Sequence, residues 1–166
     1  MAKFVWHNGE VSSQMQVRQV YGLIFTHDGR MLMKVENKPN GKVFSLAGGT
    51  PEVFDENKEA TLRRELIEEV NVTIEKPLMV GYQEVDEENG KPSYAQVRMV
   101  AIIDNIGEVK PDPDNGETYE RLLTSPSRVI ELLNWGSVGK SQVEEAFRIA
   151  REQLGIVSVN NKEEYV

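Results

Sequence analysis

Residues 48–72 of this 166-residue chain read GGTPEVFDENKEATLRRELIEEVNV, and they carry most of the information in the sequence. The segment opens with paired glycines, passes through an acidic loop, and continues from Asn57 as a run of strong helix formers. Asn57 is a residue type that caps helix N-termini, so it predicts where the helix begins. Leu62, Leu66 and Val70 recur at helical spacing. The segment therefore predicts a glycine turn followed by a helix whose apolar stripe faces the core.

Three glutamates share one face of this predicted helix. Glu65, Glu68 and Glu69 lie within an arc of about 100° beside the apolar stripe. Like charges at i,i+4 cost roughly 0.2–0.5 kcal/mol even when exposed, and repulsion is stronger near a buried face. Taken alone, the three favour a solvated acidic face with Arg63 and Arg64 as partners. A hard cation would also relieve the repulsion, and Mg²⁺ or Mn²⁺ suits oxygen ligands.

The residues before the helix favour the metal site over the solvated face. Gly48 and Gly49 follow a predicted strand, and Glu56 lies beside the helix start. Paired glycines let the backbone approach a ligand closely and turn its carbonyls or amides towards it. A strand, a glycine turn, an acidic loop and a helix with a carboxylate face together predict a polyphosphate–metal site.

The remaining sequence predicts strands and helices in one domain, residues 1–166. Strands are expected at 17–25, 30–35, 43–47, 72–85 with a break at Pro77, and 95–104. A turn at 27–29 and loops at 37–41, 86–92 and 111–116 separate them. Helices are expected at 127–133 and 141–154, divided at 134–136, and the polar tail 160–166 is expected to fray. Interspersed strands and helices predict a mixed sheet covered by helices.

Composition and charge narrow the class of protein. The chain has no cysteine, which excludes disulfides, thiolate nucleophiles and zinc–thiolate sites. Its net charge of −8 disfavours duplex nucleic acid as a partner, although bound cations can still admit a small phosphorylated ligand. No stretch has the length of a signal peptide core or a membrane span. These features predict a cytoplasmic protein without a membrane partner.

The segment resembles the Nudix box, whose pattern is G-x5-E-x7-R-E-U-x-E-E-x-G-U, with U an aliphatic residue. Residues 64–72, RELIEEVNV, match its second half at every position but one, and Glu56 precedes Arg64 at the required spacing. Two departures are present. Six residues instead of five separate Gly49 from Glu56, and Asn71 replaces the closing glycine. A surface loop absorbs one residue cheaply, and asparagine tolerates the left-handed conformation expected after the helix.

The resemblance implies an α+β fold, an α/β/α sandwich with a mixed sheet, and a metal-dependent hydrolase. Glu65, Glu68 and Glu69 would bind Mg²⁺ or Mn²⁺, with Glu69 a principal ligand. A backbone carbonyl of Gly48 or Gly49 and the carboxylate of Glu56 would add contacts. Arg64 would orient the glutamates through a salt bridge. The implied reaction is attack of water on a phosphorus of a nucleoside diphosphate linked to another group.

Three questions stay open from sequence alone. The general base is either a box glutamate or one on a later loop, where Glu117 is preferred over Glu120 because of its position before residues 121–123. The partner is expected to be a small nucleotide, and the helix at 141–154 either packs on the sheet or supports a homodimer. A nucleotide-sensing module that does not hydrolyse its ligand is the alternative function, although it would not need to retain the three glutamates.

Overall fold

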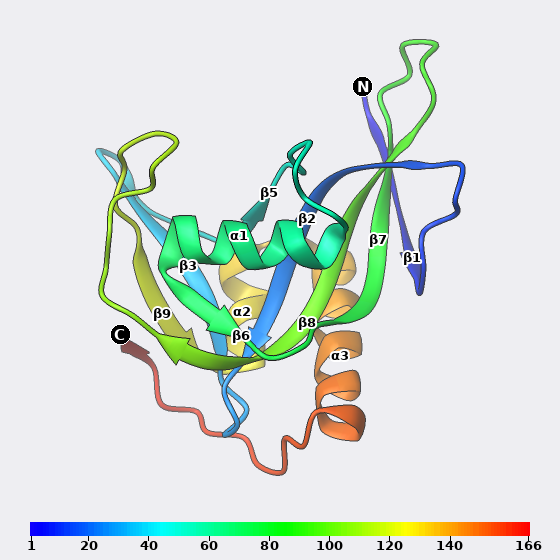
Figure 1. The fold of residues 1–166 in the computed structure, drawn as a ribbon. Helices are drawn as coiled ribbons and strands as arrows, with labels where there is room; N and C mark the ends of the chain where they lie inside the picture. The colour runs from blue at the N-terminus through cyan, green and yellow to red at the C-terminus, as the bar shows by residue number, and fades with distance from the viewer.

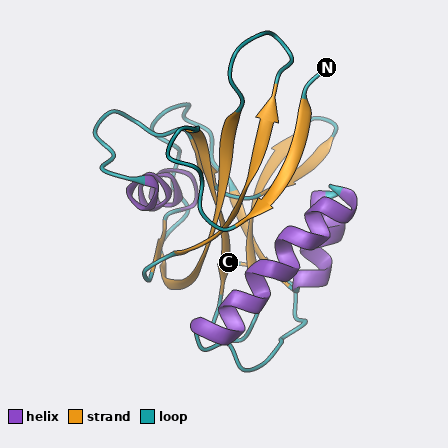
Figure 2. Ribbon diagram, turned by 90° about the vertical axis from the view of Figure 1, so that its right-hand side faces the viewer, coloured by secondary structure: helices purple, strands orange, loops and turns teal.

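The computed structural model describes residues 1–166 as three layers, with a sheet between one helix on one face and two on the other (Figures 1 and 2). The helices are α1 (Lys58–Val70), α2 (Pro126–Leu133) and α3 (Gly136–Gln153). The ten strands are β1 (Lys3–Asn8), β2 (Gln16–Phe25), β3 (Met31–Lys38), β4 (Gly41–Ser45), β5 (Gly48–Gly49), β6 (Val72–Ile74), β7 (Leu78–Asp86), β8 (Tyr94–Ile106), β9 (Glu120–Thr124) and β10 (Glu164–Tyr165). The expected α/β/α sandwich is confirmed. None of the helices combines the length and the apolar character needed to cross a membrane.

The sheet is mixed, as its sequence predicts. Its strand order is β1-β7-β8-β2-β3-β9-β10, with β4 on β3, β5 on β2 and β6 on β8. The two central strands, β2 and β8, pair in parallel, whereas the neighbouring pairs are antiparallel. The parallel pair brings together segments that lie far apart in the sequence, and β5 attaches to β2 beside it. The glycine turn is thereby fixed at the centre of the molecule.

Alternating side chains of the central strands divide the interior into two cores. Leu23 and Phe25 of β2 face α2 and α3, whereas Val20 and Ile24 face α1 and contact the cluster that contains Leu62. This period of two is the geometry of a strand buried on both sides. Each face of the sheet is consequently covered by its own helical layer, which Figure 2 shows edge-on.

Helix α1 begins and ends at the residues that the sequence predicts. The Asn57 side chain accepts a hydrogen bond from the backbone N–H of Ala60 at 2.9 Å, so Asn57 is the N-cap. Asn71 adopts the left-handed conformation with φ of 52°, and its N–H donates to the carbonyl of Ile67. Both caps are therefore confirmed, and the substitution of asparagine for glycine preserves the helix end.

The prediction that residues 160–166 fray is wrong. Strand β10 pairs with β9, and the backbone carbonyl of Val166 accepts a hydrogen bond from Arg121 at 3.0 Å. The Arg30 guanidinium donates to Glu164 at 2.7 Å, and Asn160 bonds the turn at Asp28. The polar groups of the tail therefore have partners elsewhere in the fold, and these contacts hold the tail in place.

Two boundaries and two further strands differ from the sequence-based expectation. The expected loop at 37–41 is mostly strand, because β3 continues to Lys38 and β4 starts at Gly41. Helix α3 starts at Gly136, several residues earlier than expected, directly after Asn134 ends α2 in the left-handed conformation. Strands β1 and β9 were not predicted, since neither has a strong alternating pattern of its own.

Candidate metal and catalytic site

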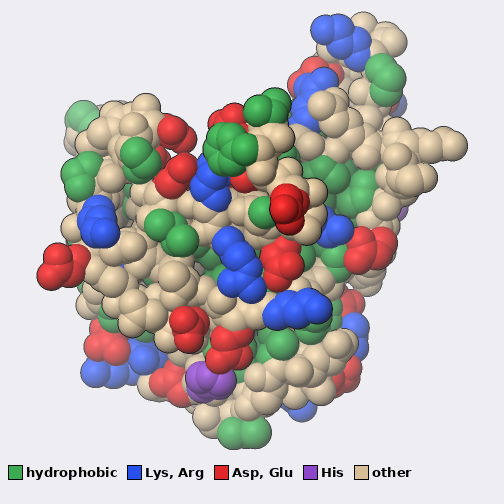
Figure 3. All heavy atoms as spheres, viewed as in Figure 1, with side chains coloured by type: hydrophobic (Ala, Val, Ile, Leu, Met, Phe, Trp, Pro, Cys, Tyr) green, Lys and Arg blue, Asp and Glu red, His purple; other side chains and the backbone are tan.

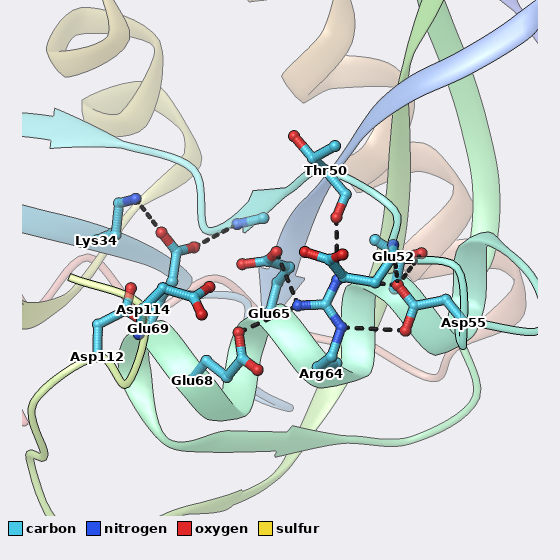
Figure 4. Close-up of polar contacts among 12 residues, drawn as sticks. Lys34, Thr50, Glu52, Asp55, Arg64, Glu65, Glu68, Glu69, Asp112 and Asp114 are labelled. Atoms are coloured by element: carbon cyan, nitrogen blue, oxygen red, sulfur yellow. Dashed lines mark hydrogen bonds and ion pairs between the residues drawn. The ribbon is translucent and has the colours of Figure 1, made fainter.

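The three glutamates of α1 form a row that faces the end of β5 (Figure 4). Glu65 and Glu69 are only 9% and 7% exposed, and Glu68 is half-buried beside them. They are buried because Leu62 and Leu66, one turn away, hold this side of α1 against the sheet. Carboxylates at this depth cannot be fully hydrated, so they need positive partners or a cation.

The glycine pair provides the opposite wall, and the backbone at Gly48 requires glycine. A Cβ at Gly49 would lie 2.5 Å from a carboxylate oxygen of Glu65. Gly48 has φ of +153° and would direct a Cβ onto the Val20 carbonyl oxygen. Its backbone N–H donates to Glu69 at 2.8 Å. The absence of side chains thus lets the β5 backbone approach the two most buried carboxylates.

Arg64 holds two of the glutamates in place from one end of the row. Its Nη1 donates to Glu65 and to Glu68, each at 3.1 Å. Its Nε and Nη2 bond the carboxylate of Asp55 at 3.1 and 2.9 Å, and Nη2 also donates to the Thr50 carbonyl. This guanidinium therefore joins the loop after β5 to α1 through charge-assisted hydrogen bonds.

A lysine that sequence reasoning did not consider lies at the other end of the row. Lys34 of β3 places its Nζ 2.5 Å from Glu69 and 4.8 Å from the centre of the Tyr119 ring. Its signal in the sequence is a single lysine within the apolar stretch at 31–35. Lys34 neutralises the most buried of the three glutamates.

Two aspartates complete the acidic cluster from a distant loop. Carboxylate oxygens of Glu68, Asp112 and Asp114 all lie within 4.8 Å of one another. Asp112 is buried, although it lies on a loop. Figure 3 shows charged side chains at a hollow between the loop of residues 107–119 and the loop that follows β5. Five carboxylates from two segments therefore surround one concave region.

The electrostatics of the row disfavour its full ionisation. Burial raises the pKa of Glu65 to about 7, aided by repulsion from Glu69 and Glu68 and opposed by Arg64. Burial likewise raises the pKa of Glu68 and Glu69, despite Arg64 beside one and Lys34 beside the other. Asp55 behaves oppositely, because hydrogen bonds from Arg64 lower its pKa to about 2. Oxygen ligands under mutual repulsion fit a hard divalent cation, which would remove the cost of ionising them.

Glu56 and Glu117 do not join this cluster. Glu56 is exposed and contacts neither Arg64 nor the glutamates, whereas the preceding Asp55 takes the position beside Arg64. The extra residue in this loop has shifted which acid faces the helix. Glu117 is also exposed, and its carboxylate accepts a hydrogen bond from Tyr119 at 3.1 Å. The same loop instead contributes Asp112 and Asp114, whose sequence signal is a pair of aspartates on either side of Pro113.

This chain resembles known proteins both in sequence and in structure. The family model described as NUDIX domain matches residues 15–145. A pyrophosphohydrolase of Bacillus subtilis, BsRppH, matches with a TM-score of 0.66 and 15% identity over 93% of each chain. MutT, described for Aliivibrio salmonicida and Vibrio cholerae, matches with a TM-score of 0.55 and 17% identity over 78% of this chain and 98% of that one. A NUDIX hydrolase from Nitrosomonas europaea matches with a TM-score of 0.56 and 16% identity over 88% of this chain and 93% of that one. No curated protein sequence matches significantly. At these identities the structural likeness establishes the fold.

Proposed function

The chain belongs to the NUDIX domain family and is a hydrolase of phosphoanhydride bonds, and on that premise we propose a more specific activity. It is a divalent-cation-dependent pyrophosphohydrolase that cleaves a nucleoside diphosphate linked to another group. The B. subtilis neighbour is itself described as a pyrophosphohydrolase, which is the class proposed for this chain.

One observation carries the proposal. Glu65 and Glu69 are buried against the β5 backbone, next to Glu68 and two loop aspartates, with fewer positive groups than carboxylates around them. Glu65 and Glu68 share Arg64, and Glu69 has Lys34. A solvated acidic face would leave these groups exposed, so their burial supports a cation site over that alternative.

Glu65, Glu68 and Glu69 are the proposed ligands of Mg²⁺ or Mn²⁺, together with the backbone carbonyl of Gly49. Asp112 and Asp114 extend the acidic set towards the loop. When bound, the cation would neutralise phosphate charge and lower the pKa of an attacking water. Arg64 acts as a positioning residue, because all of its hydrogen bonds fix protein groups.

The proton acceptor is proposed among the carboxylates that border the hollow. Glu65 is the first candidate, because its carboxylate lies against the Gly49 backbone among the proposed cation ligands, where the attacking water would be held. Glu117 is the second candidate and ranks below Glu65, since its carboxylate is exposed and held by the Tyr119 hydroxyl. Glu56, also expected as a ligand, ranks below Asp112 and Asp114, because it lies outside the cluster that those two aspartates form with Glu68.

The deciding experiment is hydrolysis of a nucleotide panel with Mg²⁺, with Mn²⁺ and with EDTA. The variant Glu69→Gln is expected to lower kcat by about 10²-fold or more, because it removes a ligand oxygen charge without changing the size of the side chain. Glu56→Gln is the matched control and is expected to retain activity within about threefold. Glu117→Gln separates the two candidate bases, since loss equal to that of Glu69→Gln would favour the loop residue.

Two outcomes would contradict the proposal. Cleavage that is equal in Mg²⁺ and in EDTA would remove the cation from the reaction. Nucleotide binding without cleavage of any compound would favour the sensing module instead.

A further inference from the structure

One carboxylate of the row already holds a positive charge that belongs to the protein itself. Lys34 of β3 places its Nζ 2.5 Å from Oε2 of Glu69, and the backbone N–H of Gly48 donates to Oε1 at 2.8 Å (Figure 4). Both oxygens of this most buried glutamate therefore have a donor. Since Mg²⁺ binds carboxylate oxygens at about 2.1 Å, a cation on Oε2 would lie within about 5 Å of Nζ. Two positive charges at this distance repel each other strongly inside a protein, so Lys34 and a divalent cation compete for Glu69.

Lys34 is the donor at Glu69 that can leave. The N–H of Gly48 belongs to β5, which is paired with β2, so it cannot move without disrupting the sheet. The Lys34 ammonium can donate three hydrogen bonds, and Glu69 is its only hydrogen-bond partner in the protein. Its other neighbour is the ring of Tyr119, whose centre lies 4.8 Å from Nζ and attracts a cation without fixing its direction. The flexible lysine side chain can therefore move away from Glu69 while its strand stays in place.

Arg64 shows what a fixed cation looks like at the other end of the row. Its three side-chain nitrogens make five hydrogen bonds, of which two reach Asp55 and one reaches the Thr50 carbonyl, all outside α1. Moving Arg64 would break all five, whereas moving Lys34 breaks one. The two cations therefore differ in what they can do: Arg64 holds the row to its loop, and Lys34 is free to exchange.

The surroundings of Lys34 suggest where its charge goes after it leaves Glu69. Its side chain is 17% exposed, so the ammonium is not sealed inside the core. Its two neighbours, Glu69 and Tyr119, belong to α1 and to the end of the loop that carries the two aspartates of the acidic cluster. A phosphate held at these carboxylates through a cation would lie within reach of the released ammonium, and lysine is a common ligand of phosphate.

We propose that Lys34 is an exchangeable counter-ion of Glu69, which leaves Glu69 when a divalent cation binds and then contacts a phosphate oxygen of the substrate. The inference rests on the proposed function, because it assumes that the cation and the diphosphate lie at the α1 carboxylates. In the free protein Lys34 compensates the buried charge of Glu69. In the cation-bound protein the same ammonium is available to the substrate. Lys34 therefore weakens cation binding in the absence of substrate and strengthens phosphate binding in its presence.

The test follows the accessibility of Nζ by brief acetylation of the wild-type protein. The modified fraction of each lysine is measured by peptide mass spectrometry in EDTA, in Mg²⁺, and in excess Mg²⁺ with methylenediphosphonate, a diphosphate analogue that is not hydrolysed. Lys34 is expected to react roughly tenfold or more faster in Mg²⁺ than in EDTA, because a charge-assisted hydrogen bond no longer holds its Nζ. The diphosphonate is expected to protect Lys34 again, because its oxygens accept the released ammonium.

Lys58 is the matched control within the same protein. It is the first residue of α1 and is also ion-paired, with its Nζ 3.3 Å from Glu10, but it contacts none of the carboxylates of the row. Its rate of acetylation is expected to be the same in all three solutions. The Tm in each solution shows independently whether Mg²⁺ has bound. A Lys34 that reacts no faster in Mg²⁺, or that is not protected by the diphosphonate, would overturn the proposal.

Lys34→Met removes the competing charge and keeps a long, unbranched side chain. By calorimetric titration it is expected to bind Mg²⁺ more tightly than wild type by roughly tenfold or more, and methylenediphosphonate in excess Mg²⁺ more weakly by about tenfold. Lys58→Met should change neither affinity. A static charge beside the site would also lower Mg²⁺ affinity, but only an exchanged lysine changes its own reactivity, and that readout does not depend on whether a variant folds. Mg²⁺ binding to Lys34→Met that is no tighter than to wild type would contradict the competition.

Hydrolysis of the nucleotide panel separates failure of this inference from failure of the proposed function. Cation-dependent cleavage with no change in the reactivity of Lys34 would keep the proposed function and reject the exchange. Release of Lys34 by Mg²⁺ without cleavage of any compound would keep the exchange and reject hydrolysis. If Mg²⁺ changes neither the Tm nor the reactivity of Lys34, the cation site is rejected and the exchange with it.

Discussion

Glu65 is held in a place where its ionised form is unfavourable. It lies against the Gly49 backbone, near Glu69, and it receives one hydrogen bond from Arg64. Its pKa of about 7 lies above the ordinary value of 4.5, so the folded state holds this proton more tightly than the unfolded chain does. The cation-free protein therefore loses stability as pH rises from about 4.5 through 7.

Glu65→Gln is accordingly expected to stabilise the cation-free protein above pH 7. The neutral amide removes a cost on the order of 3 kcal/mol at pH 8, and the gain should be small at pH 4.5, where Glu65 is protonated in the folded state and about half protonated in the unfolded chain. Thermal unfolding in EDTA at the two pH values measures the difference. A variant less stable than wild type at pH 8 would contradict the expectation. The same variant should lose the stabilisation by Mg²⁺ that the proposed cation site predicts for wild type.

Asp55 and Glu56 are neighbours with opposite expected effects. Arg64 lowers the pKa of Asp55 to about 2, so this carboxylate stabilises the fold above pH 3.8 and its contribution is lost as pH falls towards 2. Asp55→Asn is expected to cost about 2 kcal/mol of unfolding free energy at pH 7 and little at pH 2. Glu56→Gln, at an exposed position, should change it by no more than about 0.5 kcal/mol. Denaturant unfolding of both variants at both pH values tests this difference. Equal losses of unfolding free energy at pH 7 would show that Asp55 is not the acid that faces Arg64.

At the scale of elements, Asn71 does more than end α1. Its side chain donates to the Glu108 carbonyl at 2.8 Å, and its own carbonyl accepts from Gly107 at 2.9 Å. A Cβ at Gly107 would lie 2.4 Å from the Asn71 amide nitrogen, so a side chain there would displace the Asn71 side chain. The helix end therefore anchors the start of the loop that carries Asp112 and Asp114.

Asn71→Gly tests this anchor without disturbing the helix end. Glycine keeps the left-handed conformation, so the expected loss is only that of the side-chain hydrogen bond, about 1 kcal/mol. Hydrogen exchange in residues 107–118 should become faster while α1 stays protected. Asn71→Ala adds roughly 1–2 kcal/mol of left-handed strain and should be the less stable of the two. Unchanged exchange in the loop of Asn71→Gly would show that other contacts hold it.

Elements whose signal is local could be predicted, and those defined by tertiary contact could not. Helix α1 has its own caps and stripe, so its bounds and its three glutamates followed from periodicity. Strand β9 and the tail depend on Arg121 and on β3, which no local pattern reveals. Asp112 and Asp114 were missed for the same reason, since only docking of their loop brings them to Glu68. The spacing of the Nudix box assigned Glu56 to the site. Spacing alone does not determine which of the two adjacent acids, Asp55 or Glu56, faces the helix.

At the scale of the whole molecule, the tail closes one edge of the sheet. Glu164 bonds Arg30, Glu163 bonds Thr124, and the Val166 carbonyl bonds Arg121. Removing residues 161–166 is expected to cost roughly 3 kcal/mol, about 1 kcal/mol for each of these contacts. Urea unfolding of the shortened chain measures it, and Val157→Ser, at a residue that is 92% exposed, is the control without effect. Unchanged stability would mean that β10 adds nothing to the sheet.

The parallel pairing of β2 with β8 at the centre of the sheet is expected to limit the rate of folding. Gln16 pairs with Tyr94 and Phe25 with Ile102, so every contact between β2 and β8 closes a loop of about half the chain. The entropy of that closure is lost before the contacts compensate for it, which makes refolding slow compared with that of a helical bundle. Until β8 arrives, β2 leaves an apolar edge open to association with other chains. Cation affinity should therefore emerge late in refolding, and dilute, cool conditions should favour recovery of the native protein.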